Sequence, residues 1–157
     1  MNMNAKKFKV SEHVEGIVTH VFDTMLTLKA APGKSGLLSP ERVSGVIGFA
    51  GEHVIGGVYV HLPDSLAREI TRSMVQRPPG QNAGDSDVND AVGELSNMIG
   101  CRLKSLLNDA DIFCAVSTPS VIRGAFAVDA PQGVTAETFY FICFGHRFAV
   151  EVHLQFN

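Results

Sequence analysis

The chain has 157 residues, of which 45% are hydrophobic and 18% are charged, and its formal net charge at pH 7 is −3. A chain of this length and composition can bury a full hydrophobic core within one domain, which excludes an intrinsically disordered protein. The chain has 13 Lys and Arg and 16 Asp and Glu. Because basic residues are not in excess, we expect no nucleic-acid partner and no attraction to an anionic membrane. The longest unbroken apolar run, Phe139 to Phe144, is far too short to span a membrane.

The cysteines, the histidines and the start of the chain bear on the compartment and on metal binding. The three cysteines are odd in number and lack metal-site spacing, and the six histidines show no His-x-His or His-x-x-x-His pattern. The basic stretch near the start has no apolar run behind it, unlike a secretory signal. We therefore expect a cytoplasmic protein with reduced thiols and no metal site. We also expect a tail over residues 1–9, followed by a single domain whose core covers residues 10–156.

The first half of the chain predicts a helix, a glycine-rich hairpin and a second helix. Residues 11–28 place apolar side chains at helical spacing on one face, formed by Val14, Ile17, Val18, Val21, Phe22 and Met25. Residues 43–61 are rich in Val and Ile without a helical period, so we predict two strands joined by a turn near Gly51 and Glu52. The five glycines of this segment predict bends, or another element packed close to a strand. A second helix is predicted over residues 63–75.

The second half of the chain predicts a loop, a long helix and four strands. A polar stretch rich in Pro and Gly at 77–87 predicts an exposed loop, and a helix follows from about residue 87 to residue 107. Strands are predicted at 111–117, 121–129, 138–145 and 147–156. Gly145 and His146 predict a two-residue turn in the last hairpin, and the alternation that follows predicts a strand with one face on the core and one in water. The order of the elements predicts an α+β fold with a largely antiparallel sheet and helices packed on it.

The helix predicted at 87–107 has two distinct faces. Its broad apolar face, which accounts for core packing, consists of Ala91, Val92, Leu95, Met98, Ile99, Leu103 and Leu106. Almost opposite lies a narrow polar stripe of Asp90, Glu94, Asn97, Cys101 and Asn108. A solvated surface is the simplest explanation of such a stripe. However, no Lys or Arg occurs between Arg77 and Arg102, whereas a solvated helix normally intersperses basic with acidic residues.

Small residues line one flank of the polar stripe, namely Gly93, Ser96 and Gly100. Two glycines inside a helix cost about 1 kcal/mol each relative to alanine, so they predict a close approach to the helix backbone. A neighbouring helix of the same chain would explain them. The functional alternative is a partner protein whose loop reaches Glu94 and Asn97, in which case Gly93 and Gly100 belong to the partner-binding surface.

The spacing Asp90-x-x-x-Glu94-x-x-Asn97-x-x-Gly100 resembles the signature of the CheC/CheX/FliY phosphatases of bacterial chemotaxis. The glycine-bearing segment at 46–57 and the Pro-to-Gly segment at 118–124 resemble the CheX members at matching places, and the final hairpin also fits. The resemblance covers residues 10–156. It implies a single CheX-like domain over residues 1–157 with a CheC-like α+β fold, an internal duplication and one long site-bearing helix.

This resemblance implies an enzyme that hydrolyses the aspartyl phosphate of a CheY-type response regulator, in chemotaxis or in related two-component signalling. It assigns Asn97 to positioning the attacking water, Glu94 to pairing with the lysine of the receiver, and Asp90 to docking. It also implies that the protein needs no cofactor of its own, that Mg2+ is supplied by the phosphorylated partner, and that two chains join through sheet edges as a homodimer. CheC-like members carry the motif twice, but the residue three after Glu15 is the apolar Val18, so we expect a single site per chain, as in CheX.

Two alternatives stay open at the level of sequence. The same fold can serve as a non-catalytic docking module that binds a receiver, or another signalling protein, without turnover. It can also serve as a structural dimerisation domain whose polar stripe is merely solvated. Loss of phosphate release in a variant of Asn97 distinguishes the enzyme from both alternatives.

Overall fold

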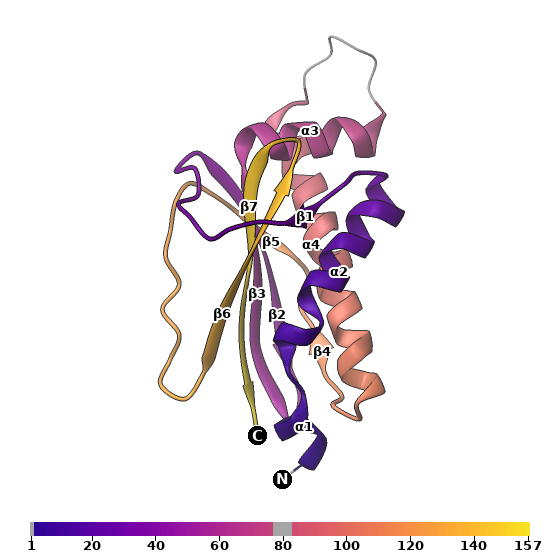
Figure 1. The fold of residues 1–157 in the computed structure, drawn as a ribbon, viewed down its shortest axis with the longest axis vertical. Coiled ribbons are helices and arrows are strands. Elements are labelled where there is room, and N and C mark those ends of the chain that lie inside the picture. Colours follow the sequence, from indigo (N-terminus) through magenta and orange to yellow (C-terminus); the bar gives the residue numbers. More distant parts are fainter. Residues whose placement is uncertain (1, 77–82) are drawn as a thin grey trace.

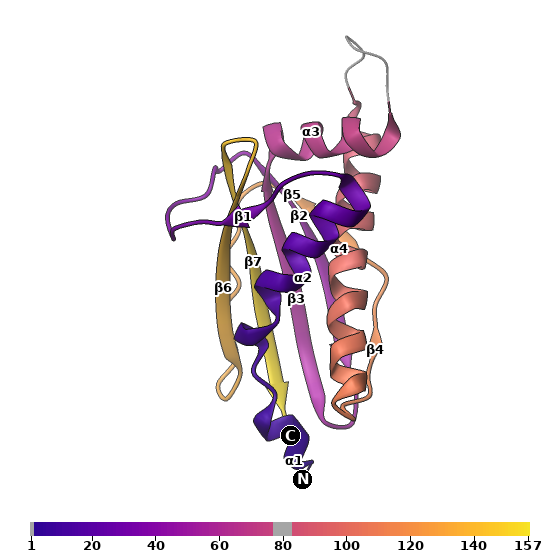
Figure 2. The same ribbon diagram turned by 45° about the vertical axis from the view of Figure 1, so that its right-hand side comes forward.

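The computed structural model describes residues 2–76 and 83–157. Helices α2 and α4 lie side by side along one face of an antiparallel sheet, and α3 crosses the end of that sheet (Figures 1 and 2). The helical segments are α1 (Met3–Lys7), a 3-10 turn (Val10–Glu12), α2 (Val14–Val21), a π-helical turn (Phe22–Leu26), α3 (Asp64–Val75) and α4 (Asp85–Asp109). The strands are β1 (Ala31–Pro32), β2 (Arg42–Ala50), β3 (Val54–Pro63), β4 (Ala115–Val116), β5 (Ser120–Arg123), β6 (Thr135–Cys143) and β7 (His146–Phe156). No helix in these two ranges is both long enough and apolar enough to cross a membrane.

The sheet contains two hairpins that are arranged with near symmetry. Its strand order is β1-β6-β7-β3-β2-β4, and β5 also pairs with β2. The second strands of the two hairpins, β3 and β7, therefore pair at the centre, while the first strands, β2 and β6, lie outside them. A helix precedes each hairpin, α2 before β2–β3 and α4 before β6–β7, as an internal duplication implies. The structure thus confirms the predicted α+β fold with an antiparallel sheet and helices packed on it.

The hydrophobic core lies between the helices and the sheet. Phe22 stacks on Phe148, with ring centroids 5.0 Å apart, and Phe148 stacks in turn on Phe141 at 5.3 Å. From α4, Leu95 and Leu103 reach the same core and are fully or almost fully buried. These side chains occupy the apolar stripes that the sequence predicts, because a helix buries the face on which its apolar residues repeat.

The predicted glycine-rich hairpin and the helix at 63–75 are confirmed as β2–β3 and α3. The long helix is confirmed as α4 and extends two residues further at each end. The loop predicted at 77–87 lies mostly outside the described residues. Residues 3–7, at the start of the chain, form α1, whose Ala5 is buried.

Several details of the predicted β structure are wrong. The last hairpin turns on Phe144 and Gly145, with φ of 50° and 73°, one residue earlier than predicted. This turn places two consecutive residues at positive φ, which matches the twist of the flanking strands. The strand predicted at 121–129 ends at Arg123, because Gly124 at φ 100° turns the chain out of the sheet. The strand predicted at 111–117 is reduced to β4.

The sheet face opposite the helices is only partly exposed to water, contrary to the prediction for β7. Ala149 and His153 on that face are buried. The segment between β5 and β6 crosses over this region, where Phe126 packs against His61 with ring centroids 5.4 Å apart. The alternation in β7 correctly indicates two faces, but it cannot show that an irregular segment covers the second one.

Helix α2, which lies within the helix predicted at 11–28, also departs from the sequence prediction at its C-terminal end. The regular α-helix stops at Val21 and continues as a π-helical turn over residues 22–26. Phe22 and Leu26 remain buried in this wider turn, while Met25 is 62% exposed. The prediction that Met25 belongs to the core face is therefore wrong, because the spacing of an α-helix does not hold through a π-helical turn.

Candidate functional site

Helix α4 is held unusually close to strand β2 by small residues on both elements. A methyl group on Gly45 would lie 1.8 Å from the Ser96 Oγ atom, so Ser96 occupies the space that a β-carbon would take. A methyl group on Gly100 would lie 2.9 Å from the Cγ2 atom of Ile47. The buried hydroxyl of Ser96 has a hydrogen-bond partner in this position, since it donates to the Val92 carbonyl oxygen at 2.7 Å. The glycines of β2 therefore allow another element to approach, as the sequence predicts.

The structure assigns Gly93 and Gly100 to packing within the chain. Both residues are buried, and a β-carbon on Gly93 would meet Pro119 at 3.6 Å. Strand β2, and not the neighbouring helix expected from the sequence, makes the close approach at Gly100, whereas the contact at Gly93 is an ordinary one. A role of Gly93 and Gly100 at a partner-binding surface stays a prediction.

The polar stripe of α4 faces away from this packed side. Asp90, Glu94 and Cys101 are exposed, and Asn97 is half-buried between them. Glu94 and Asn97 are separated by about 4.5 Å along the helix axis, so their side chains lie on one face. Within the described part of the chain, no basic side chain forms an ion pair with Asp90 or Glu94. The thiol of Cys101 donates to the Asn97 Oδ1 atom across 3.7 Å, one turn further along the helix.

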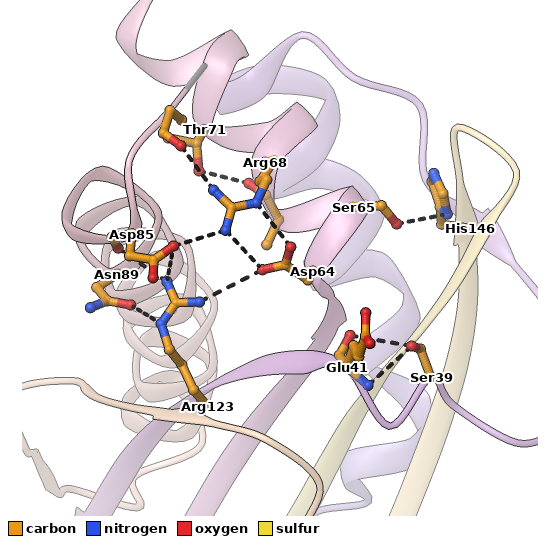
Figure 3. A network of polar contacts seen from close by, with 12 residues as sticks. Ser39, Glu41, Asp64, Ser65, Arg68, Thr71, Asp85, Asn89, Arg123 and His146 are labelled. Carbon is orange, nitrogen blue, oxygen red and sulfur yellow. Dashed lines mark hydrogen bonds and ion pairs between the residues drawn. The ribbon is translucent and has the colours of Figure 1, made fainter.

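A network of charged side chains fixes the N-terminal end of α4 (Figure 3). Arg123 of β5 donates to the Asn89 Oδ1 atom and to the Asp85 carbonyl oxygen, each at 3.1 Å. Arg68 of α3 pairs with Asp64 at 2.9 Å and with Asp85 at 2.8 Å. The hydrogen bond from Arg68, followed by the nearby charge of Arg123, lowers the pKa of the Asp85 carboxyl group from its ordinary value. The helix that carries the polar stripe is therefore anchored to both α3 and β5.

Sequence reasoning missed this network because its members lie on three elements that are far apart in the chain. Asp85 and Asn89 are one helical turn apart and share a face, which is visible in the sequence. Nothing in the sequence indicates that Arg123, 34 positions after Asn89, lies opposite that face. Only the pairing of β5 with β2 places Arg123 there.

The exposed chemical groups of the stripe are suited to orienting a reactant. A carboxamide offers one acceptor and two donor positions, and a carboxylate accepts hydrogen bonds from a lysine or arginine. Among the residues that the structure describes, no three His, Cys, Asp or Glu side chains are grouped as metal ligands. The stripe thus presents the Asn97 amide beside the Glu94 carboxylate, which forms no ion pair among the described residues.

A family model described as "Chemotaxis phosphatase CheX" matches residues 43–142 of the chain. The chain belongs to the CheX family of chemotaxis phosphatases. The matched segment contains β2, β3, α3, α4 and most of β6, and it therefore includes the whole polar stripe. The family and the phosphatase class predicted from the sequence are confirmed.

Solved structures of chemotaxis proteins share the fold of this chain. The chemotaxis protein CheX from Vibrio vulnificus has 23% sequence identity and a TM-score of 0.80, over 95% of this chain and 98% of that one. A putative chemotaxis protein from Desulfovibrio vulgaris Hildenborough has 26% identity and a TM-score of 0.76, over 94% and 97% of the two chains. The structure of a CheX–CheY–BeF3–Mg2+ complex from Borrelia burgdorferi has 20% identity and a TM-score of 0.73, over 94% and 98%. No curated protein matches the chain.

Proposed function

We propose that this chain hydrolyses the aspartyl phosphate of a CheY-type response regulator. In this proposal Asn97 positions the attacking water and Glu94 pairs with the active-site lysine of the receiver. The observation that carries the proposal is the placement of these two groups one helical turn apart on the outer face of α4, with Glu94 free of any ion-pair partner in the described residues. The related complex from Borrelia burgdorferi, in which a CheX protein is bound to CheY, supports the choice of partner.

The reaction needs positioning more than strong acid–base catalysis. Water attacks the phosphorus atom, the bond from phosphorus to the acyl oxygen breaks, and that oxygen leaves with the electron pair as an aspartate carboxylate. Because a carboxylate is a weakly basic leaving group, holding the water in line contributes more than removing its proton early. The amide of Asn97 accepts a hydrogen bond from the water through its oxygen, or donates one through its nitrogen, and so fixes the line of attack.

Glu94 and Asp90 act on the complex rather than on the phosphorus atom. A carboxylate at position 94 forms a charge-assisted hydrogen bond with the lysine ammonium group of the receiver, which fixes the orientation of the two proteins. Asp90, one turn earlier, extends the acidic surface and contributes to docking. Mg2+ neutralises charge on the phosphoryl oxygens. We assign this ion to the receiver, because the related complex contains CheY, BeF3 and Mg2+ together with CheX.

Two further properties belong to the proposal. We expect a homodimer joined through a sheet edge, and the outer side of β6 offers such an edge, since β1 pairs only with Phe141 and Ile142.

We also expect a cytoplasmic location, because Cys101, Cys114 and Cys143 are all free thiols. The cytoplasm is the compartment that keeps such thiols reduced.

The proposed function is tested by phosphate release from the CheY-type receivers of the source organism, each phosphorylated in the presence of Mg2+. We expect the wild-type chain to accelerate release, and Asn97→Ala to lower its maximal rate by about 100-fold, which is typical for loss of one group that orients the transition state. Glu94→Ala should mainly raise KM, by about tenfold, since it removes a contact formed on docking. Asp109→Ala, which removes an exposed acidic residue from the end of the same helix, serves as the matched control and should behave like wild type.

The outcomes separate the proposal from its alternatives. Full activity of Asn97→Ala, with an unchanged circular dichroism spectrum, would refute the assigned role of that residue. Receiver binding without any acceleration would identify a docking module that lacks turnover. Because the side chains of Asn97 and Glu94 point away from the core, we expect both variants to fold.

A further inference from the structure

A hollow lies directly beside the polar stripe, between α4 and the C-terminal end of α2 with the π-helical turn that follows it. Its volume is about 290 Å³, and its walls include His20, Thr24, Met25, Met98, Cys101 and Arg102. Two of these side chains are thioethers, and Met25 is among the more exposed large apolar residues of the described chain. The hollow is therefore an accessible, partly apolar depression.

The hollow is continuous with the position of Asn97. Cys101 forms part of its wall, and the thiol of that residue contacts the Asn97 Oδ1 atom at 3.7 Å. Met98, the residue after Asn97, lines the hollow from the same helix. A protein whose phosphoryl group reaches Asn97 therefore lies next to the hollow, because Cys101 both contacts Asn97 and forms part of the wall.

The π-helical turn exposes the methionine of this surface. In the turn over residues 22–26, Phe22 and Leu26 remain in the core while Met25 points outward. The turn closes the C-terminal end of the helix, where π-turns are common. Methionine is flexible and polarisable, so an exposed methionine adapts readily to an apolar side chain of a partner.

The charges along α4 change sign between the two ends of this surface. Asp90 and Glu94 lie on the N-terminal side of Asn97, whereas Arg102 lies on the C-terminal side at the rim of the hollow. In the described ranges of the chain, Arg102 has no carboxylate partner, and neither acidic residue has a basic one. A complementary partner therefore presents a basic group toward Glu94, an acidic group toward Arg102 and an apolar group between them.

We propose that this hollow is a second docking site for the phosphorylated receiver, on the opposite side of Asn97 from Glu94. It accepts an apolar side chain from the receiver surface next to the phosphorylation site, and Arg102 pairs with a neighbouring carboxylate of the receiver. The inference rests on the proposed function, because it takes the receiver as the occupant. Contacts on both sides of Asn97 fix its amide relative to the phosphorus atom better than the single contact of Glu94 does.

The test measures binding of a CheY-type receiver that carries Mg2+ and beryllofluoride, which stands in for the phosphoryl group. The receiver used is the one whose phosphate release the wild-type chain accelerates. We expect Met25→Asp and Arg102→Glu each to raise Kd by about tenfold, as expected for contacts near the centre of an interface. Met3→Asp is the matched control, because Met3 is 71% exposed on α1 and does not line the hollow. It should bind like wild type.

Phosphate release by the same variants separates docking from chemistry. For Met25→Asp and Arg102→Glu, KM should rise with Kd, and the rate at saturating receiver should fall far less than the about 100-fold loss expected for Asn97→Ala. Met25→Ala removes the same side chain without adding a buried or exposed charge, so it controls for a folding defect in Met25→Asp. It should also raise Kd, and its melting temperature should equal that of wild type.

The inference and the proposed function fail in different ways. Wild-type affinity in Met25→Asp, Met25→Ala and Arg102→Glu, together with weaker binding of Glu94→Ala, would exclude the second docking site and leave the phosphatase intact. Absence of any acceleration by the wild-type chain would instead contradict the proposed function, and the inference would fall with it.

Discussion

His61 lies at the centre of a buried polar cluster on the sheet face opposite the helices. Its Nδ1 atom is 2.7 Å from the Ser44 hydroxyl, and its Nε2 atom is 2.9 Å from the Glu151 Oε1 atom. His153 contacts the other oxygen of the same carboxylate. Burial is the largest influence on His61 and lowers its pKa from the ordinary value of 6.5, although the hydrogen bond that its ring donates to the Glu151 carboxylate opposes this change.

Because of this lowered pKa, we predict that His61 contributes to a loss of stability in mild acid. The unfolded chain takes up a proton at position 61 near pH 6.5, whereas the folded chain does so only at lower pH. The free energy of unfolding should therefore fall as the pH drops below about 6.5, because the unfolded state then binds more protons. In urea denaturation at pH 7.5 and pH 5.5, we expect His61→Gln to lose less stability between the two values than wild type does.

An exposed histidine provides the control for this pH prediction. His20 is exposed and lies outside the buried cluster, so His20→Gln should show the same pH dependence as wild type. Equal losses of stability in wild type and His61→Gln would show that His61 does not contribute to the acid sensitivity.

At the scale of the elements, the contact between Ser96 and Gly45 sets how closely α4 approaches the sheet. We predict that Gly45→Ala destabilises the protein by about 1–3 kcal/mol, because the added methyl group would overlap Ser96 and force the helix away from β2. Removing the opposing side chain should relieve this overlap. The double variant Gly45→Ala/Ser96→Gly should therefore be more stable than the sum of the two single changes implies, by about 1 kcal/mol or more.

A double-mutant cycle measured by urea denaturation tests this prediction. Ser96→Gly alone is expected to cost about 1 kcal/mol, because glycine lowers helix stability. A purely additive cycle would mean that α4 adjusts its position without strain, and that the small residues do not determine its distance from β2. The cycle also includes its own control, since both single variants are measured under the same conditions.

Periodicity is sufficient to predict the long helix and the last strand, and the Val and Ile content predicts β2 and β3. The same reasoning fails for Met25, because the helix changes to a π-helical turn that the local sequence pattern does not indicate. For Gly100 the sequence correctly indicates a close approach, but it leaves open whether the same chain or a partner makes it. In the structure Ile47 of β2, a strand distant in sequence, makes that approach. The spacing of Glu94 and Asn97 was predictable, whereas the Arg123 network and the hollow depend on tertiary placement.

At the scale of the whole molecule, the burial of Val18 on α2 supports our expectation of a single site per chain. The two helix–hairpin units place α2 and α4 side by side on the same face (Figure 2). Val18, three positions after Glu15, lies in the core and cannot reach a partner. The duplicated helix therefore contributes packing and one wall of the hollow, whereas α4 presents the polar stripe.

The same sheet leaves one outer edge partly open. In antiparallel strands, the backbone groups of successive residues point alternately to the two neighbouring strands. The Tyr140 carbonyl oxygen accepts a hydrogen bond from the Gly33 amide at 2.8 Å, on the outer side of β6. The backbone groups of Ala136 and Thr138 point to that same side, beyond the two residues that pair with β1. This open edge is the candidate for the proposed homodimer, since two identical strands can pair there about a twofold axis.

Thr138→Pro should convert the expected dimer into a monomer. Proline removes the outward amide donor of Thr138, which the fold of a single chain does not use, and proline is tolerated on an edge strand. We expect light scattering to give the mass of two chains for wild type and of one chain for Thr138→Pro, with both proteins melting cooperatively. Thr138→Ala retains the amide donor and should remain dimeric. A monomeric wild-type protein would remove the dimer from the proposal, and a dimeric Thr138→Pro variant would place the interface on another surface, such as the edge formed by β4 and β5.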